Sequence, residues 1–203
     1  MPLSKKTRLF LTGTCITVAI LAVAGALYAR HEYVKYRPRV VEAGLLFRSR
    51  QLPEKVLGQL NRYGIKTVLD LRGDADEEPA VRKREEEIVR SQGIDFVFLP
   101  MTTSQVVPTE AQLQRFLELL RGPGRPVLVH CREGKVRTGM LVASFRVLYD
   151  GWSPDKALGE MYSFSQKITP EGTKQQAEFL RGLESRRQEL MQPVSEKAQA
   201  GGK

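Results

Sequence analysis

The chain has 203 residues, of which 32 are Lys or Arg and 23 are Asp or Glu, so its formal net charge at pH 7 is +9. This length fits one domain of ordinary size with extensions, and the two cysteines do not supply the disulfide framework of a small secreted protein. The basic balance favours anionic substrates or an anionic lipid surface. Nucleic acid is not an expected partner, because no basic helix is interleaved with aromatic residues.

The amino-terminal segment is read as a membrane anchor. Residues 1–8 form a short basic tail, and residues 9–29 contain no charged side chain. A helix of that length spans the hydrocarbon core of a bilayer, which needs ~20 residues. We therefore expect a single-pass signal-anchor at 9–29. The alternative is a cleaved signal peptide, since Ala24-Gly25-Ala26 resembles a small-residue cleavage site, and the mature protein would then be soluble.

The orientation of this segment is only weakly determined, because basic residues flank it on both sides and the positive-inside rule nearly cancels. Short amino-terminal tails usually stay in the cytoplasm, which would place the rest of the chain outside it, in the periplasm if the source is a Gram-negative bacterium. Residues 30–38, which end at Pro38, are expected to form a basic juxtamembrane linker.

Strands and helices are predicted to alternate in the first half of the remaining chain. Hydrophobic periodicity and turn residues predict, in order, two short strands within 40–48 about Gly44, a helix over 53–63, a buried strand over 65–71, a helix over 80–92 and a strand over 95–99. The helix over 80–92 is expected to bury Val81, Ile88 and Val89. An acidic loop, 72–79, and a polar loop, 100–108, follow the two longer strands.

The second half continues the alternation. Thr109 is expected to cap a helix to Arg121 that buries Leu113, Phe116, Leu117 and Leu120. The remaining predicted elements are a strand over 126–130, a helix over 138–149, a helix capped by Ser153 and running to about 164, a final helix over 173–191 and a disordered tail over 193–203. This alternation predicts an α/β fold with a mostly parallel central sheet flanked by helices, and with ligands bound at the carboxyl ends of the strands.

The most informative stretch runs from Pro126 to Gly139. A short apolar strand ends at His130 and is followed by Cys131, an intervening loop that contains Gly134, then Arg137 and an apolar helix. A strand, a tight loop and a helix amino terminus form an anion site, in which the local field lowers the pKa of a cysteine. Arg137 can hold two oxygens of a phosphate. A thiolate in a phosphate cradle indicates phosphoryl transfer through a phosphocysteine intermediate.

This stretch resembles the signature of the cysteine-dependent protein tyrosine and dual-specificity phosphatases, His-Cys-x5-Arg-Ser/Thr-Gly. Weaker similarities at 46–49, 64–72 and 151–153 resemble the bacterial members of the dual-specificity-like group. The resemblance covers 40–165 and implies a phosphatase domain over 39–192. It implies no metal and no cofactor.

The resemblance also implies a role for each residue of the motif. Cys131 is expected to be the nucleophile, and Arg137 the phosphate clamp. Thr138 is expected to hydrogen-bond the departing sulfur, to cap the helix, or both. His130 and Gly139 are expected to be structural, with His130 fixing the loop through a side-chain hydrogen bond. The phosphate is expected to be bound by the loop residues Arg132, Glu133, Gly134, Lys135, Val136 and Arg137.

The other basic side chains in and near the motif have two interpretations. The pattern Cys-x-x-Gly-Lys-x-Arg resembles the loops of phosphatases that act on phosphoinositides and inositol pyrophosphates, so Lys135, and Arg132 with it, would suit a substrate with several phosphates. The alternative is a solvent-facing charge. Arg48 and Arg72 are candidate rim cations, or partners of acidic residues.

The chain departs from the family in its expected general acid. The family usually has an Asp in the loop a few tens of residues before the cysteine, but residues 101–107 contain no carboxylate. Asp74, on the neighbouring acidic loop, is the candidate substitute, and Asp70, Asp76 and Glu77 at or next to that loop are further possibilities. Each of them would otherwise belong to a solvated acidic turn.

The sequence therefore predicts a membrane-anchored cysteine phosphatase that acts on phosphotyrosine-type protein or on a polyphosphorylated, inositol-like molecule. One alternative is a phosphate-binding pseudophosphatase that serves as a membrane-tethered interaction module; the missing Asp favours it, and the intact Cys131 and Arg137 oppose it. A rhodanese-like sulfurtransferase is disfavoured by the Arg137-Thr138-Gly139 continuation. The oligomeric state is not determined by the sequence.

Overall fold

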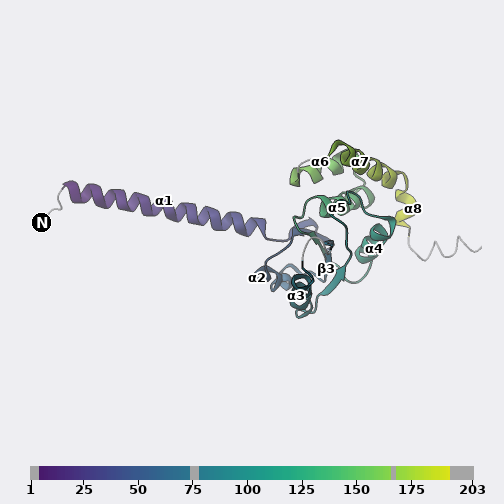
Figure 1. The fold of residues 1–203 in the computed structure, drawn as a ribbon, viewed down its shortest axis with the longest axis horizontal. Helices are drawn as coiled ribbons and strands as arrows, with labels where there is room; N and C mark the ends of the chain where they lie inside the picture. The colour runs from purple at the N-terminus through teal and green to yellow at the C-terminus, as the bar shows by residue number, and fades with distance from the viewer. Residues whose placement is uncertain (1–4, 74–77, 166–167, 193–203) are drawn as a thin grey trace, which may run out of the picture. The chain divides into compact units, whose positions relative to one another are not determined.

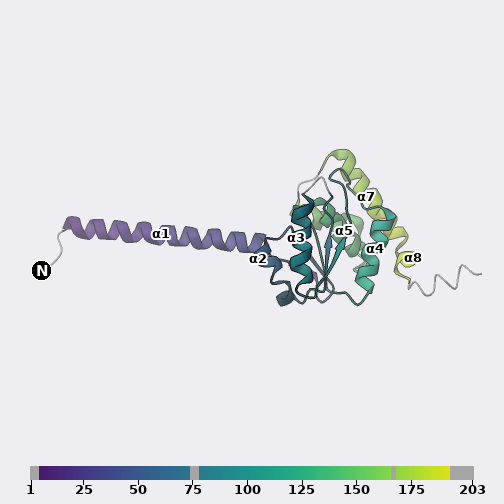
Figure 2. The same ribbon diagram turned by 60° about the horizontal axis from the view of Figure 1, so that its bottom comes forward.

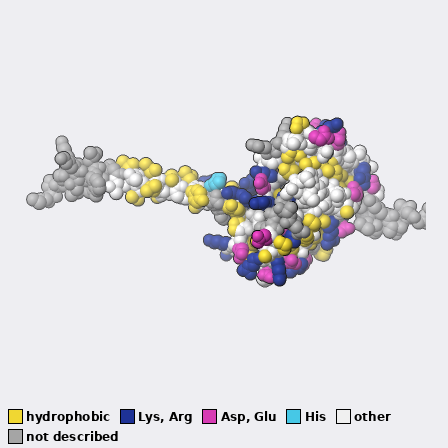
Figure 3. Space-filling view, viewed as in Figure 1, with side chains coloured by type: hydrophobic (Ala, Val, Ile, Leu, Met, Phe, Trp, Pro, Cys, Tyr) yellow, Lys and Arg dark blue, Asp and Glu magenta, His cyan; other side chains and the backbone are white. Residues whose placement is uncertain are grey.

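The computed structural model describes residues 5–73, 78–165 and 168–192. The chain divides into two units, Met1–Arg37 and Pro38–Lys203, which are described separately. The first unit contains one helix, α1 (Lys5–Lys35). Its 18-residue stretch Thr14–His31 is long and apolar enough to cross a membrane, as a signal sequence also would be, and none of it is buried. Figure 3 shows hydrophobic side chains along the described part of this helix.

The second unit is built on a five-stranded sheet in which the strand order is β1-β2-β5-β3-β4. Strands β2, β5, β3 and β4 run parallel, and β1 is antiparallel to β2 at one edge. The mostly parallel sheet predicted from the sequence is thus confirmed. The strands are β1 (Arg39–Glu42), β2 (Leu46–Arg50), β3 (Thr67–Asp70), β4 (Asp95–Phe98) and β5 (Val127–Cys131).

Helices cover both faces of the sheet (Figures 1 and 2). One face carries α2 (Glu54–Leu57), the 3-10 turn η1 (Leu60–Tyr63) and α3 (Pro79–Arg90). The other face carries α4 (Glu110–Arg121) and α5 (Val136–Leu148). Beyond α5 lie α6 (Pro154–Phe164), α7 (Pro170–Ser185) and α8 (Arg187–Met191). Helix α5 is buried along most of its length because it packs on the sheet with one side and on these outer helices with the other.

The side chains of β5 alternate between the two faces of the sheet. Val127 and Val129 pack with α4 and α5, whereas Leu128 packs with the α3 side. Because successive side chains of a strand point to opposite faces, Cys131 lies on the α5 side and His130 on the α3 side. The side chains of His130 and Cys131, although adjacent in sequence, therefore lie on opposite faces of the sheet.

Several helices begin or end at residues other than those predicted from the sequence. The helix predicted over 53–63 is two short pieces, α2 and η1, and the one predicted over 173–191 begins at Pro170 and breaks at Arg186 into α7 and α8. Val81 is 43% exposed, whereas Glu85 is buried in its place on α3. Thr109 and Ser153 cap their helices as expected. The tail over 193–203 lies outside the described residues.

Candidate active site

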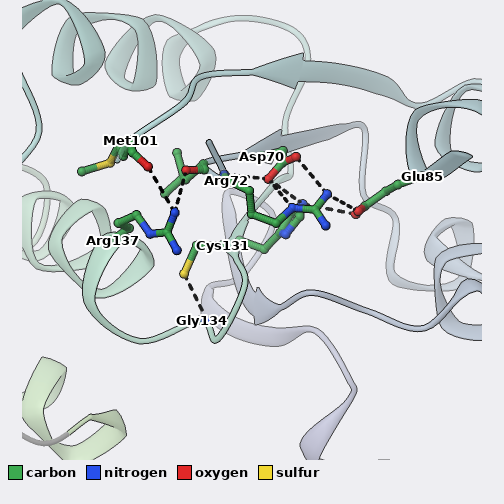
Figure 4. Close-up of polar contacts among 9 residues, drawn as sticks. Asp70, Arg72, Glu85, Met101, Cys131, Gly134 and Arg137 are labelled. Atoms are coloured by element: carbon green, nitrogen blue, oxygen red, sulfur yellow. Dashed lines mark hydrogen bonds and ion pairs between the residues drawn. The ribbon is translucent and has the colours of Figure 1, made fainter. Parts of the chain in front are cut away.

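The sulfur of Cys131 lies at the carboxyl end of the central strand, at the start of a tight loop. Cys131 is the last residue of β5 and is 2% exposed. The backbone N–H of Gly134 donates a hydrogen bond to its Sγ, with the two atoms 3.2 Å apart (Figure 4). The loop therefore directs a backbone hydrogen-bond donor at the sulfur.

Gly134 is required both by its own conformation and by the neighbouring strand. Its φ is +69°, and an added Cβ would lie 2.5 Å from the backbone oxygen of Ser49 and 2.7 Å from the backbone nitrogen of Arg50. A side chain at this position would therefore be strained and would also clash with the end of β2. The Arg48 Nη2 donates to the Gly134 carbonyl oxygen at 2.9 Å. This contact ties the phosphate loop to β2 from the side of the Gly134 carbonyl.

The amino terminus of α5 closes the loop. The helix begins at Val136, and its N-cap residue Lys135 makes no side-chain capping hydrogen bond. Helix α4, by contrast, begins with a complete capping box between Thr109 and Gln112. The first N–H groups of a helix have no acceptor within the helix, so the start of α5 presents donors and a positive dipole end to the loop.

Arg137 is held beside Cys131 by the two neighbouring loops. It is 9% exposed, and its Nη1 donates to the carbonyl oxygens of Met101, at 3.1 Å, and Leu71, at 3.4 Å. These carbonyls follow β4 and β3, so both loops at this edge of the sheet fix the guanidinium. In Figure 4 the guanidinium of Arg137 and the sulfur of Cys131 point to the same place. A planar guanidinium in this position can grip two oxygens of an anion next to the sulfur.

The two candidate rim cations are both buried, so that hypothesis is wrong. Arg72 is 1% exposed and pairs with Asp70 and Glu85. Arg48 is 3% exposed, and its guanidinium lies 3.9 Å from the ring centre of Phe164. Burial lowers the pKa of Arg48 to about 10, which leaves it charged at neutral pH. Arg48 therefore supports the loop through the Gly134 carbonyl, and Arg72 holds Asp70 and Glu85.

A charged cluster lies on the α3 side of the sheet. Figure 4 shows Asp70, Arg72 and Glu85 of this cluster, and His130 completes it through its contact with Glu85. Both carboxylate oxygens of Asp70 accept hydrogen bonds from Arg72, at 2.9 Å each. Burial alone would raise the pKa of Asp70, but His130 and Arg72 outweigh it and lower the pKa. Glu85 ties α3 to this edge of the sheet because its carboxylate contacts Arg72.

The expected hydrogen bond from His130 to the loop does not form. Its Nε2 instead lies 3.3 Å from Glu85 Oε1 and 3.8 Å from Asp70 Oδ1. Neither ring nitrogen has a hydrogen-bond partner among the described residues. The strand alternation explains the correction, since His130 points to the face opposite Cys131. Its structural contribution comes through the charged cluster.

The structure removes one candidate for the general acid. Asp70 is fully buried, ionised and bonded to Arg72 on the face away from the sulfur, so it cannot deliver a proton to a leaving group. Asp74, Asp76 and Glu77 lie outside the described residues. The loop over 101–107, which has no carboxylate, adjoins the site through the bond from Arg137 to the Met101 carbonyl.

Thr138 and Gly139 belong to the first turns of α5. Thr138 is not the helix cap, because the helix begins two residues before it. It is fully buried, and its hydroxyl has no hydrogen-bond partner among the residues described. An added Cβ at Gly139 would lie 2.6 Å from the Met161 Cγ, so this glycine allows α5 and α6 to pack closely.

The exposed rim of the loop carries three charged side chains, Arg132, Glu133 and Lys135. Lys135 Nζ lies 2.8 Å from Glu133 Oε2. A groove of about 920 Å³ opens beside the loop, lined by Lys135 and Val136 on one side and by residues 162–165 and 168 on the other. In the described ranges, no group of three or more His, Cys, Asp and Glu side chains is placed to hold a metal ion.

Sequence reasoning missed three contributions to this arrangement. Arg48 was expected to be a rim cation or an ion-pair partner, and neither its bond to the Gly134 carbonyl nor its contact with Phe164 had a local signal. Glu85 had a usable signal, because it stands four residues before Val89 and three before Ile88, on the apolar stripe of α3. A charged residue at such a position indicates a buried partner.

Comparison with known proteins identifies several similar chains. A family model described as a DSP-PTPase phosphatase fused to NAD+ kinase matches residues 38–182. The dual specificity protein phosphatase TpbA of Pseudomonas aeruginosa is 30% identical over 118 residues, which are 57% of this chain and 49% of the relative. The chain thus spans about half the length of that relative.

Two solved structures share the fold. The core catalytic domain of the PP-IP phosphatase SIW14 from S. cerevisiae, in complex with citrate, has a TM-score of 0.56 and 24% identity, and the match covers 76% of this chain and 94% of that one. P. aeruginosa TpbA in complex with pTyr has a TM-score of 0.51 and 23% identity, with 74% of this chain and 95% of that chain covered.

Proposed function

We propose that this chain, which belongs to the DSP-PTPase family of phosphatases, hydrolyses phosphate monoesters through a phosphocysteine intermediate on Cys131. The sulfur of Cys131 would attack the phosphorus, and the leaving oxygen would depart from the opposite side. Water would then attack the phosphorus and release inorganic phosphate and the thiolate. Family membership sets the sulfurtransferase alternative aside.

The observation that carries this proposal is the convergence of three groups on one point. The Cys131 sulfur accepts the Gly134 N–H, the start of α5 is free of a side-chain cap, and Arg137 is fixed beside the sulfur by the Met101 and Leu71 carbonyls. A phosphate held by these donors would place its phosphorus next to the sulfur. The loop residues 132–137 are proposed to supply the cradle.

Thr138 is proposed to act in the second step. Its buried hydroxyl lies in the first turn of α5 and has no partner among the described residues, so it can donate to the Cys131 sulfur when the thiolate is released. The intact Cys131 and Arg137 support an enzyme over the phosphate-binding pseudophosphatase. The direct test is hydrolysis of para-nitrophenyl phosphate by the full chain, and a protein that binds phosphate without turnover would be a pseudophosphatase.

The substrate is proposed to be a phosphotyrosine-type protein or a polyphosphorylated, inositol-like molecule. TpbA has been crystallised with pTyr, and SIW14 is a PP-IP phosphatase. The groove beside the loop is open and is lined in part by Tyr162 and Phe164, which suits an aromatic ring next to the phosphate. Arg132, exposed on the rim, suits further negative charge, and Lys135 would do so when released from Glu133.

We expect activity to depend steeply on the leaving group, because residues 101–107 supply no acid. The leaving groups of aryl phosphates and phosphoanhydrides depart with little protonation. The alkoxide leaving group of an alkyl phosphate needs a proton, and a general acid that supplies it raises the rate by about 10²–10⁴-fold. The value of kcat/KM should therefore fall from para-nitrophenyl phosphate to phosphotyrosine to phosphoserine. A wild-type enzyme with a flat dependence on leaving-group pKa would require an acid.

Asp74 is then the proposed general acid, which would protonate the leaving group. The variant Asp74→Asn should then lower kcat on phosphotyrosine far more than on para-nitrophenyl phosphate. Asp95→Asn is the matched control, because Asp95 is an exposed aspartate at the start of β4, away from the carboxyl ends of the strands. An equal loss on both substrates would exclude Asp74 as the proton donor.

We also propose that the chain is a single-pass membrane protein whose domain, residues 39–192, lies outside the cytoplasm. The tail 1–8, the anchor 9–29 and the linker 30–38 would tether it, and 193–203 would be a disordered tail. The long apolar helix α1 supports the anchor.

The full-length protein should fractionate with membranes and resist extraction by high salt. A spanning helix is held by the hydrophobic effect, whereas the attraction of a basic surface to anionic lipid is screened by salt. Release by salt would exclude the anchor. Recovery in the soluble fraction at the mass of residues 27–203 would instead establish a cleaved signal peptide.

A further inference from the structure

An acidic side chain stands inside the phosphate loop and holds the loop's own lysine. Glu133 and Lys135 flank Gly134, whose positive φ folds the loop so that their side chains meet. The Oε2 of Glu133 lies 2.8 Å from Nζ of Lys135, and the two side chains are 60% and 50% exposed. A cation at the edge of an anion site is therefore already paired within the loop.

Glu133 is ionised when it makes this contact. The hydrogen bond from Lys135 and its positive charge lower the pKa of Glu133, with smaller contributions from Arg50 and Arg132. The pair is neutral as a unit, so it removes one positive charge from the rim. It also places a fixed negative charge near any anion that enters the loop.

Lys135 also lines the groove beside the loop. A second phosphate, joined to the one in the cradle, would extend toward this groove or along the rim. In either direction it would compete with Glu133 for Lys135 and would be repelled by the Glu133 carboxylate. A substrate with one phosphate and an aromatic group makes no such demand, since its groove-facing part is uncharged.

We propose that Glu133 is a specificity-determining residue that selects substrates with a single phosphate, of the phosphotyrosine type, against substrates in which a second phosphate adjoins the first. This inference rests on the proposed function and narrows its substrate class. The pair of Glu133 and Lys135 is the selecting element. Lys135 is available to a second phosphate only when Glu133 is displaced or removed.

The test compares the binding of inorganic phosphate and pyrophosphate to the full chain in detergent, by calorimetry at low ionic strength. All proteins carry Cys131→Ser so that no ligand is consumed. Glu133→Gln should raise the ratio of pyrophosphate affinity to phosphate affinity by about fivefold, because a half-exposed charge acts on a nearby anion through a high dielectric. The rise should shrink in 0.5 M salt, where the Debye length is only a few ångströms, about 3–5 Å.

Glu86→Gln is the matched control. Glu86 is also an exposed glutamate paired with a cation, Arg90, at 2.7 Å, but it lies on α3, away from the loop. Its removal changes the net charge equally and should leave the affinity ratio unchanged. Adding Lys135→Met to Glu133→Gln should abolish the gain, because the freed cation is then lost.

Three outcomes would overturn the proposal: a change in the ratio below twofold in both Glu133→Gln and Glu133→Ser, an equal rise in Glu86→Gln, or a rise that persists without Lys135. Failure of the proposed function is a separate result, since it would appear as absence of para-nitrophenyl phosphate turnover by the wild-type chain. The binding ratio is measured whether or not the wild type turns over.

Discussion

The variant Cys131→Ser is expected to lose turnover of para-nitrophenyl phosphate by a factor of at least about 100, while it still binds phosphate. The Gly134 N–H and the uncapped start of α5 present hydrogen-bond donors to an anion at this position. A serine hydroxyl has a much higher pKa and stays protonated at neutral pH. The variant therefore keeps the cradle and loses the nucleophile.

The control for this variant is Cys15→Ser, which replaces the other cysteine of the chain, on α1. It should match the wild type in turnover. Phosphate binding by Cys131→Ser, measured by calorimetry, shows that the loop is intact. Turnover by Cys131→Ser above about a hundredth of the wild-type rate would rule out a covalent intermediate on this sulfur.

Arg137→Lys is expected to lower kcat by about 10²–10³-fold, the usual cost of removing one donor that stabilises a transition state. A lysine keeps the charge but is a single point donor, so it cannot bind two phosphate oxygens in one plane. It also cannot both reach the Met101 and Leu71 carbonyls, which now fix the guanidinium, and face the phosphate. The Met101 carbonyl would lose this donor, whereas the Leu71 carbonyl would keep the bond from the Met101 N–H.

Arg146→Lys on the same helix is the matched control. Arg146 lies near the other end of α5, where it pairs with Glu160 and Asp150. Its replacement changes the same chemical group and should leave kcat close to wild type. A near-normal kcat for Arg137→Lys would falsify its role as the clamp, and equal losses in both variants would point to a disturbed helix.

The fold was predictable because its strands and helices carry strong local patterns. The apolar spacing of Leu113, Phe116, Leu117 and Leu120 and the cap at Thr109 define α4, and all four side chains are buried. Breaks such as Arg186 and the division of 53–63 were not predictable, since tertiary packing decides them. Val81 was misplaced because Glu85 occupies the buried stripe of α3, where its partner Arg72 comes from another loop.

The site was predictable in part for a similar reason. A strand, a loop and a helix that are contiguous in sequence bring Cys131, Gly134 and Arg137 together, so the motif alone indicates their neighbourhood. The supports from other elements, Arg48 under the loop and the Met101 carbonyl on Arg137, are long-range contacts without local signals. The face that His130 adopts follows from strand alternation, which places its side chain opposite that of Cys131.

The placement of the two cysteines has a consequence for oxidative damage. Cys131 is in the unit Pro38–Lys203, and the other cysteine, Cys15, is on α1 in the separate unit. A thiolate is the form that peroxide oxidises first, to a sulfenic acid, and a nearby second thiol normally traps that state as a reversible disulfide. The unit that carries Cys131 has no such thiol. Recovery would then depend on a thiol from outside this unit, and without one the sulfur would proceed to the irreversible sulfinic acid.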